Sequence, residues 1–271
     1  MNALPLVSAD WLALRARADD RARSAGLAEA AARLIGAGPL VVHDLGSGTG
    51  AMMRWLAPRL PGPQAWVLHD ADPAILRHVD ARSALDEFGL PVTVRTRVER
   101  LSELPLQAFA GASLVTASAL FDVLTLDEAR AVVDACVASG VPALFSLTVV
   151  GRVRLSPGDA DDTALGTAFN DHQRRVVEGR RLLGPDSGKV MRNLFTDSRW
   201  RVRTERTPWR LGAADGGLIA EWLDGWVGAA VEQRPELGAR ATEYRLRRDA
   251  DLGHGQLRVT VQHQDVLAWP R

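Results

Sequence analysis

HDLGSGTG, residues 43–50, is the most informative run in the sequence. Its three glycines, Gly46, Gly48 and Gly50, follow an apolar run at 40–45 that is typical of a buried β-strand. Glycine lets the backbone turn tightly and approach a ligand with no side chain in between. A helix predicted to begin at Gly50 would present free backbone amides to that ligand. We therefore expect a strand, a ligand-binding loop and a helix, in that order.

Short apolar runs alternate with helical patterns on both sides of this loop, which is the signature of βα units and a mostly parallel sheet. Thr125 and Glu128 form a predicted capping box at the start of one helix, and Gly140 ends it. Asp72 and Pro73 supply an N-cap and a first-turn proline for another helix, which we expect to continue to about residue 88. The predicted strands are residues 40–45, 65–69, 92–98, 112–118 and 143–149.

Two regions flank the βα units, and we expect all of them to form one domain. Residues 1–37 are predicted to be a helical cap, broken near residues 20–24, and residues 38–150 the ligand-binding core. Residues 151–215 read as a late insertion with helices at about 162–181 and 187–197 and an extended segment at 201–206. Residues 216–271 are predicted to hold a helix with Trp222 and Trp226, followed by antiparallel strands at 257–263 and 266–268.

Composition excludes several classes of protein. The chain has 271 residues, 46% of them apolar and 24% charged, which is ordinary for a globular protein. Its 33 basic residues balance 33 acidic ones, so overall charge favours neither nucleic acid nor a membrane surface. There is no apolar run of about 18 residues that could span a membrane, and no signal-peptide pattern. With Cys136 as the single cysteine and no metal-ligand spacing, we expect a soluble, cytoplasmic protein without a disulfide or a metal.

Two ligand classes fit the glycine loop. Asp70 lies twenty residues after Gly50, at the end of the second strand, where it could accept hydrogen bonds from ribose hydroxyls. Gly46, Gly48 and Ala51 also match the dinucleotide fingerprint, which leaves an NAD(P)-dependent oxidoreductase as an alternative. Asp44 disfavours that alternative, because a carboxylate two residues before the first glycine would repel a pyrophosphate. It suits a ligand that carries an ammonium group.

At these residues the sequence resembles the class I S-adenosylmethionine-dependent methyltransferases. Asp44, Gly46, Gly48 and Gly50 match the family's first motif, and residues 70–73 match the acidic residue and x-Asp-Pro of its second. The resemblance implies a doubly wound, seven-stranded, mostly parallel α/β sheet and methyl transfer from S-adenosylmethionine to a small-molecule acceptor. The fourth strand lacks the acidic residue with which the family's fourth strand starts, so a cofactor-binding protein without transferase activity remains a second alternative.

The resemblance also implies a role for each matched position. The first motif faces the methionyl part of the donor, Asp70 holds both ribose hydroxyls and Ala71 packs against adenine. Glu99 lies beside the adenine amino group, and Ser118 lines the donor near the methyl group. In many of the family's small-molecule members the N-terminal helices form a lid or a dimer contact, where Arg15 or Arg21 would meet the methionyl carboxylate. The implied donor-binding residues are Asp44, Gly46, Ser47, Gly48, Gly50, Asp70, Ala71, Glu99, Ser118 and Arg15.

The acceptor side offers weaker signals. His172 lies on the apolar face of a predicted helix and is a candidate general base, although it also reads as a buried, hydrogen-bonded histidine. Asp122 follows the fourth strand near the expected methyl position, but it also suits a polar residue between loop and helix. Residues 174–210 carry eleven Arg or Lys against four acidic residues, which indicates a solvated face or an anionic acceptor. An RNA acceptor is less favoured because few aromatic residues interleave with these charges.

Overall fold

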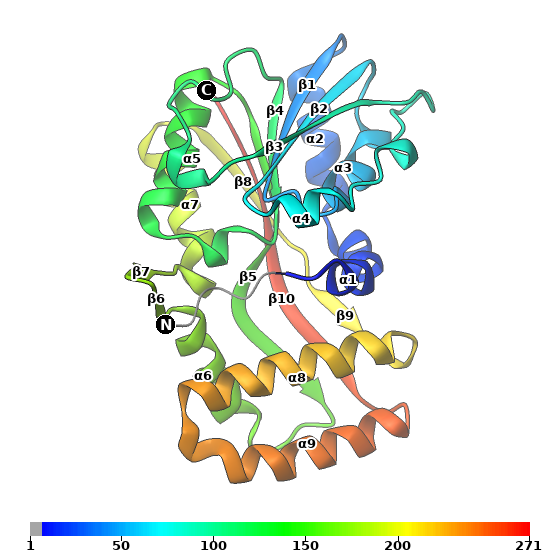
Figure 1. Ribbon diagram of the computed structural model, residues 1–271, viewed down its shortest axis with the longest axis vertical. Helices are drawn as coiled ribbons and strands as arrows, with labels where there is room; N and C mark the ends of the chain where they lie inside the picture. The colour runs from blue at the N-terminus through cyan, green and yellow to red at the C-terminus, as the bar shows by residue number, and fades with distance from the viewer. Residues whose placement is uncertain (1–6) are drawn as a thin grey trace.

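A mostly parallel sheet runs through the upper half of the molecule in the computed structural model, which describes residues 7–271 (Figure 1). Residues 1–6 of the predicted cap lie outside the described residues. Hydrogen-bonded neighbours follow the order β3-β2-β1-β4-β5-β10-β8, and β9 also pairs with β10. The strands are β1 Leu40–Leu45, β2 Gln64–Asp70, β3 Thr93–Val98, β4 Leu114–Ser118, β5 Ala143–Ser156, β8 Arg201–Arg206, β9 Trp209–Leu211 and β10 Arg258–Trp269.

Strand order reverses at β1, which pairs in parallel with β2 on one side and with β4 on the other. Only β10 and its antiparallel partners interrupt the parallel arrangement. The predicted fold class, a doubly wound and mostly parallel α/β sheet, is confirmed, and β9 adds a strand beyond the seven of the main order. In such sheets, ligands bind outside the carboxyl ends of the strands at the reversal point.

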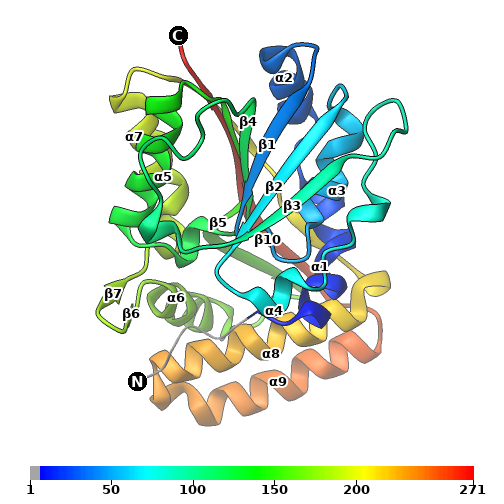
Figure 2. The same ribbon diagram turned by 45° about the horizontal axis from the view of Figure 1, so that its top comes forward.

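Helices cover both faces of the sheet (Figure 2). α2 (Ala25–Ile35) and α3 (Ala51–Leu56) pack on one face, over a core that includes Trp66 and Leu68. α5 (Leu126–Ser139) and α7 (Ser187–Asp197) pack on the other, over Val115 and Phe145. The capping box predicted at the start of α5 is confirmed by hydrogen bonds in both directions between Thr125 and Glu128.

The lower half of the molecule is built on the long ends of β5 and β10, which continue past β4 (Figure 1). α6 (Asp162–Gln173), α8 (Gly216–Gln233) and α9 (Gly238–Gly253) enclose a third core there, with Leu155, Trp226 and Tyr244 among its buried members. α1 (Ala9–Ala22) packs against β9 and α8, so it lies between the two halves. Helices of the first and last thirds of the chain therefore meet below the sheet.

Three local predictions were wrong. The helix expected at 72–88 is only α4 (Pro73–Leu76), because the Asp80 and Asp86 carboxylates accept backbone hydrogen bonds from residues 82, 88 and 90 and so favour turns over helix. The helix expected at 162–181 ends at Gln173, before the two-residue strands β6 (Val176–Val177) and β7 (Arg180–Arg181). The two late strands are one strand, β10, with bulges, and α9 was not predicted.

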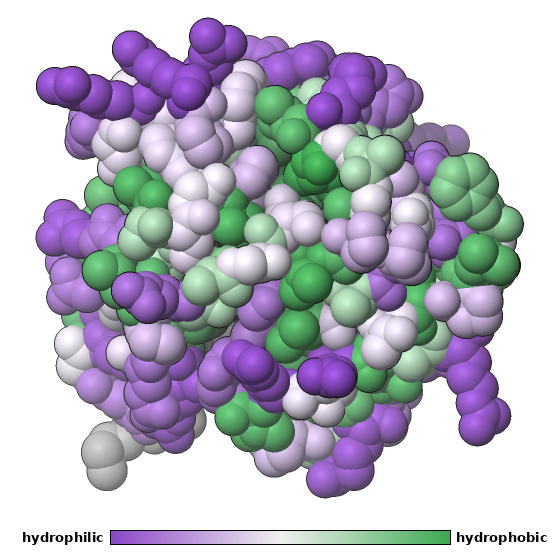
Figure 3. Space-filling model, turned by 90° about the horizontal axis from the view of Figure 1, so that it is seen from above, coloured by the Kyte–Doolittle hydropathy of each residue, from purple (hydrophilic) through white to green (hydrophobic). Residues whose placement is uncertain are grey.

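The end of the sheet farthest from the carboxyl ends of β1 and β2 is seen from above in Figure 3. Purple polar side chains occupy most of the rim, and green apolar residues are scattered between them in that view. Over residues 7–271, no helix has both the length and the apolar character needed to cross a membrane.

Candidate functional site

The carboxyl ends of β1, β2 and β4 meet in the middle of the molecule. Leu45 of β1 is in register with His69 of β2 and with Ala117 of β4, so the residues that follow each strand come together. Asp44 lies one residue before the end of β1, Asp70 ends β2 and Ser118 ends β4. The fold thus gathers the predicted donor-binding residues at the strand-order reversal.

Backbone angles and close contacts explain why the loop has glycine at positions 46 and 48. Gly46 and Gly48 have φ angles of 57° and 53°, which residues with a Cβ rarely adopt. A Cβ on Gly46 would lie 2.6 Å from Leu120 Cδ1, and one on Gly48 would lie 2.8 Å from Leu12 Cδ1. Gly50, also at positive φ, is the N-cap of α3. The side chains of Leu120 and of Leu12 on α1 therefore pack directly against the backbone of the loop.

Ser47 fixes this loop to the end of β2. Its backbone N–H donates to the carbonyl of His69 at 2.9 Å, and its carbonyl accepts from Gly50 N at 2.9 Å. The Ser47 hydroxyl is buried and makes no hydrogen bond to any described residue. A buried hydroxyl without a partner costs free energy unless a ligand or water satisfies it.

Asp44 is fully buried beside the loop. Its Oδ1 accepts from the Thr116 hydroxyl at 2.8 Å, whereas Oδ2 has no partner within the described part of the chain. Burial raises the pKa of Asp44 to about 7, against the lowering effects of the Thr116 hydrogen bond and the Arg23 charge. One oxygen of this buried carboxylate therefore lacks a hydrogen bond, and a cationic hydrogen-bond donor could satisfy it.

Asp70 is held on the other side of the loop. Its Oδ2 accepts from Gly48 N at 2.8 Å and its Oδ1 from Asp72 N at 3.0 Å. A carboxylate has about four acceptor sites, so both oxygens keep capacity for further donors such as ribose hydroxyls. Ala71, the next residue, is exposed and offers a small apolar surface beside them.

Arg23 is a further buried polar residue beside Asp44 and Ser118, and no sequence pattern singled it out. It lies between α1 and α2 with only 1% of its side chain exposed, and it donates to Asp20 Oδ1 at 2.7 Å and to the Ser118 hydroxyl at 3.1 Å. Its Nε is buried and finds no partner in residues 7–271. Burial lowers the pKa of Arg23, while Asp19 and Asp20 raise it. A buried cation therefore lies at the end of β4, close enough to Asp44 to lower the pKa of that carboxyl.

Glu99 ends a chain of polar side chains. Its carboxylate pairs with Nδ1 of His69, whose Nε2 lies 2.9 Å from Nδ1 of His43. Burial lowers the pKa of His43 to about 4, and the His69 and Arg97 charges act in the same direction. His43 packs edge-on against Phe109. Glu99 is thus held next to the end of β2 in two ways. Its side chain pairs with His69, and its backbone N–H donates to the carbonyl of Asp70 at 3.1 Å.

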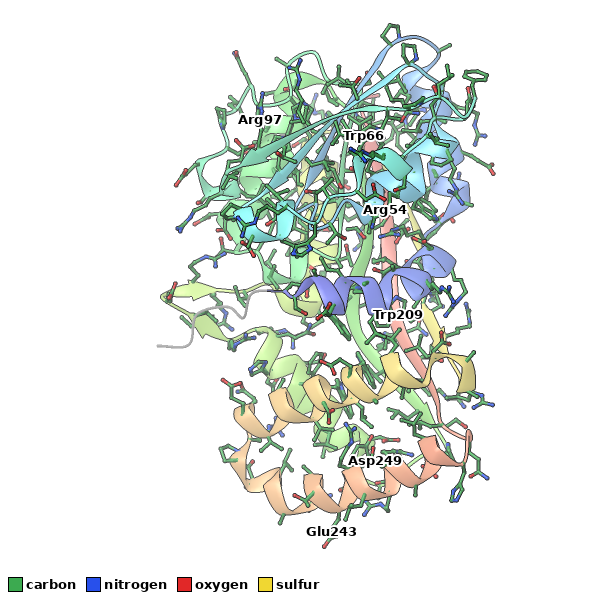
Figure 4. All side chains as sticks on the ribbon, turned by 45° about the vertical axis from the view of Figure 1, so that its right-hand side comes forward. Arg54, Trp66, Arg97, Trp209, Glu243 and Asp249 are labelled. Carbon is green, nitrogen blue, oxygen red and sulfur yellow. The ribbon has the colours of Figure 1, made fainter. Side chains whose placement is uncertain are left out.

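Arg15 has other partners than a ligand in this structure. Its guanidinium donates to both oxygens of Asp19, at 2.9 and 3.2 Å, and lies 5.0 Å from the ring of Trp209. Figure 4 shows Trp209 beside α1. The indole Nε1 of Trp209 donates to Asp19 at 2.9 Å, which completes this cluster.

The two candidate catalytic residues lie in different surroundings. Asp122 follows β4 in a short 3-10 turn, and burial raises its pKa to about 6 against the lowering effect of the Arg15 charge. His172 lies on α6, where its Nε2 is 3.2 Å from Glu232 of α8 and its Nδ1 is 3.2 Å from Arg175. Burial and the Arg175 charge lower the pKa of His172, and Glu232 raises it. Asp122 is therefore close to the donor-side residues, while His172 is bound into the contact between α6 and α8.

Acidic, histidine and cysteine side chains do not form a metal-binding group of three anywhere in residues 7–271. Cys136 is buried in α5, and burial raises the pKa of its thiol well above the ordinary value.

Comparison with known proteins places the fold. No family model and no curated protein matches the chain. Among solved structures, a putative type II methyltransferase from Anaeromyxobacter dehalogenans is 16% identical with a TM-score of 0.54, over 92% of this chain and 98% of that one. The cyclopropane synthase MmaA2 from Mycobacterium tuberculosis is 14% identical with a TM-score of 0.52, over 97% and 94%. The YcgJ protein from Bacillus subtilis is 12% identical with a TM-score of 0.51, over 90% and 97%. The chain has a Rossmann-like methyltransferase fold.

Proposed function

We propose that this protein transfers a methyl group from S-adenosylmethionine to a small-molecule acceptor. The observation that carries the proposal is the pair of buried, incompletely satisfied charges at the glycine loop. Asp44 has a free buried oxygen, and Arg23 has a free buried Nε. An amino-acid zwitterion has the complementary groups, an ammonium and a carboxylate, and the methionyl end of the donor is such a zwitterion.

Asp44 and Arg23 each bind one charged group of the methionyl end. Asp44 accepts a hydrogen bond from the ammonium group, and the resulting ion pair favours the ionised form of a carboxyl group whose pKa burial raises to about 7. Arg23 also pairs with Asp20, but its buried Nε has no partner in the described residues and it donates to Ser118 at the end of β4, so it binds the carboxylate. Arg15, the residue expected from the sequence, lies against Asp19 and Trp209. The Ser47 hydroxyl is available as a further donor or acceptor in the same space.

The nucleoside end would lie along the ends of β2 and β3. Asp70 accepts from the ribose hydroxyls with the capacity that its two backbone hydrogen bonds leave. Ala71 packs against the adenine ring, and Glu99 accepts from its amino group. His69 holds the Glu99 carboxylate, which fixes its direction.

S-adenosylmethionine supplies a methyl group bound to a positively charged sulfur, which makes that methyl group electrophilic. The protein contributes chiefly by holding an acceptor in line, an effect worth roughly 7–11 kcal/mol in well-oriented reactions. Asp122 is better placed than His172 to take a proton from the acceptor, because it follows β4 and its raised pKa of about 6 suits a general base near neutral pH.

The deciding experiment is a calorimetric titration with S-adenosylhomocysteine, with NADH in parallel, on the unmodified chain and on Asp70→Ala. We expect micromolar binding of S-adenosylhomocysteine alone and its loss in the variant. Binding of NADH instead would replace the proposal with the oxidoreductase alternative. The third reading, a binding protein without transferase activity, predicts the same titration but no conversion of S-adenosylmethionine to S-adenosylhomocysteine with any acceptor, RNA included.

A further inference from the structure

A cavity lies past the proposed donor-binding residues, where β5 continues beyond β4. It has a volume of about 480 Å³ and is lined mainly by Arg152, Arg154, Arg206, Gln262 and Gln264. Ser118, at the end of β4, is in register with Ser146 of β5, and the cavity begins at residue 150. The cavity shares no lining residue with the glycine loop or with Asp70.

Strand alternation gathers the arginines on one side of the sheet. On β5, Leu155 is buried in the core beneath α6 and α8 and Val153 is half-buried, whereas the alternate residues Arg152 and Arg154 are exposed. Arg152 also borders a neighbouring hollow that Asp162 and Trp226 help to line. Register then adds Arg206 of β8, which lies opposite Gln264 of β10. The sheet therefore presents three guanidinium groups from two different strands at a single place.

A bulge shapes the cavity between these side chains. Val261 and His263 of β10 are two residues apart, but they are in register with Val153 and Val149 of β5, which are four apart. The extra residues bend β5 opposite Gln262, and Gly151 at the bend has a φ of 69°. The bend turns a flat sheet face into a hollow whose inner wall carries the two half-buried glutamines.

These arginines have no acidic partners. Across the described range 7–271, Arg152, Arg154 and Arg206 make no ion pair and donate no side-chain hydrogen bond, whereas the half-buried Arg174 and the exposed Arg247 pair with aspartates. None of the described residues that line the cavity is acidic. Unscreened like charges around a hollow raise the local positive potential and attract anions. The cavity is therefore complementary to a multiply charged anion.

We propose that this cavity binds a small molecule that carries a phosphate or diphosphate group. The planar guanidinium fork matches phosphate oxygens in two-pronged hydrogen bonds, and the glutamine amides can donate to the remaining oxygens. The volume falls within the range of about 300–1,000 Å³ that is usual for small-molecule sites. No Phe, Tyr or Trp lines the cavity to stack a nucleic-acid base, which disfavours single-stranded RNA as the ligand.

The test uses the whole chain and inorganic pyrophosphate as the probe, titrated calorimetrically at fixed ionic strength without any methyl donor. We expect saturable binding that weakens at least about tenfold in Arg154→Gln and in Arg206→Gln, since a charge-assisted hydrogen bond contributes on the order of a tenfold factor or more. Arg130→Gln is the matched control, because Arg130 is an exposed arginine of α5 that is outside the cavity and has no ion pair in the described residues. Thermal unfolding of each variant checks that it is folded.

Each outcome decides the proposal. Absence of saturable binding, or equal weakening in Arg130→Gln, would overturn it in favour of nonspecific charge attraction. Citrate that binds as tightly as pyrophosphate would overturn the assignment to phosphate chemistry and point to polycarboxylates. A single-stranded oligonucleotide that binds more tightly than pyrophosphate, with the same dependence on Arg154 and Arg206, would replace the small molecule by nucleic acid. None of these readings depends on methyl transfer, so this inference and the proposed function fail separately.

Discussion

Replacing Asp44 with asparagine should make the unliganded protein more stable while it weakens donor binding. Burial raises the pKa of Asp44 from 3.8 to about 7, so above pH 7 the folded chain carries a carboxylate that its surroundings disfavour. That difference in pKa corresponds to about 4 kcal/mol at about 1.4 kcal/mol per pH unit. The asparagine Nδ2 would take the place of the unpartnered Oδ2 as a buried donor, which costs about 1–3 kcal/mol. The expected net gain at pH 8 is about 1–3 kcal/mol.

The gain must depend on pH in one direction. Between pH 3.8 and about 7 the folded chain holds a proton on Asp44 that the unfolded chain has released, so the destabilisation grows as the pH rises through this interval. Only about 1–2 kcal/mol of it is present at pH 5, and the advantage of the variant shrinks or reverses there. Denaturant unfolding of both proteins at pH 5 and pH 8, without ligand, measures the two differences.

Donor binding should change in the opposite sense. The unmodified chain should bind S-adenosylhomocysteine about tenfold more weakly at pH 6 than at pH 8, because only about a tenth of Asp44 is ionised at pH 6 when its pKa is about 7. Asp44→Asn should bind weakly at both values. A variant that is less stable by the same amount at pH 5 and pH 8, or that keeps the affinity of the unmodified chain, would refute this account of Asp44.

Three further substitutions test the site and its support. Arg23→Gln should weaken S-adenosylhomocysteine binding at least about tenfold but leave the affinity for adenosine, which has no carboxylate, unchanged. Arg21→Gln is the control, since Arg21 is exposed and pairs with Asp215. Equal losses of affinity for both ligands in Arg23→Gln would contradict the assignment. Gly46→Ala should lower the free energy of unfolding by at least about 1–2 kcal/mol, because residue 46 has a positive φ. Adding Leu120→Ala to this variant should restore only part of the lost stability. Full restoration would show that the contact with Leu120, and not the backbone angle, causes the loss. Ser24→Ala removes the N-cap acceptor of Leu27 N in α2 and should cost about 1 kcal/mol by denaturant unfolding, while an unchanged midpoint would assign that N–H another acceptor.

The positions of the glycine loop and Asp70 could be predicted from the sequence because they depend only on the local order of the elements. Gly46 and Gly48 follow directly on a strand, and Asp70 ends the next one, so spacing alone brings them together in a parallel sheet. Arg23 could not be chosen in this way. It donates to Ser118, which is 95 residues away, and only the packing of α1 decides which arginine of that segment turns inward.

The errors in secondary structure have a similar origin. Residues 72–88 begin with good helix signals, but two aspartate side chains further along compete for backbone N–H groups, and this competition outweighs propensity. In the lower half, the bulged strand β10 reads as two strands because its bulges interrupt the alternation of apolar residues. The arginine-lined cavity was also beyond prediction, since it depends on the register between β5, β8 and β10.

If α1 borders the donor's binding site, as the proposed function requires, donor binding and the docking of α1 are thermodynamically coupled. Leu12 of this helix borders the loop at Gly48, and Arg23 at its end reaches Ser118. Under the proposed function, the donor's binding site is therefore complete only while α1 is docked. By thermodynamic reciprocity, a ligand that needs α1 in place must hold it there with the same free energy. Saturation with S-adenosylhomocysteine should therefore slow amide exchange and proteolysis in residues 9–22, and any molecule that loosens α1 should act as an inhibitor without competing for the loop.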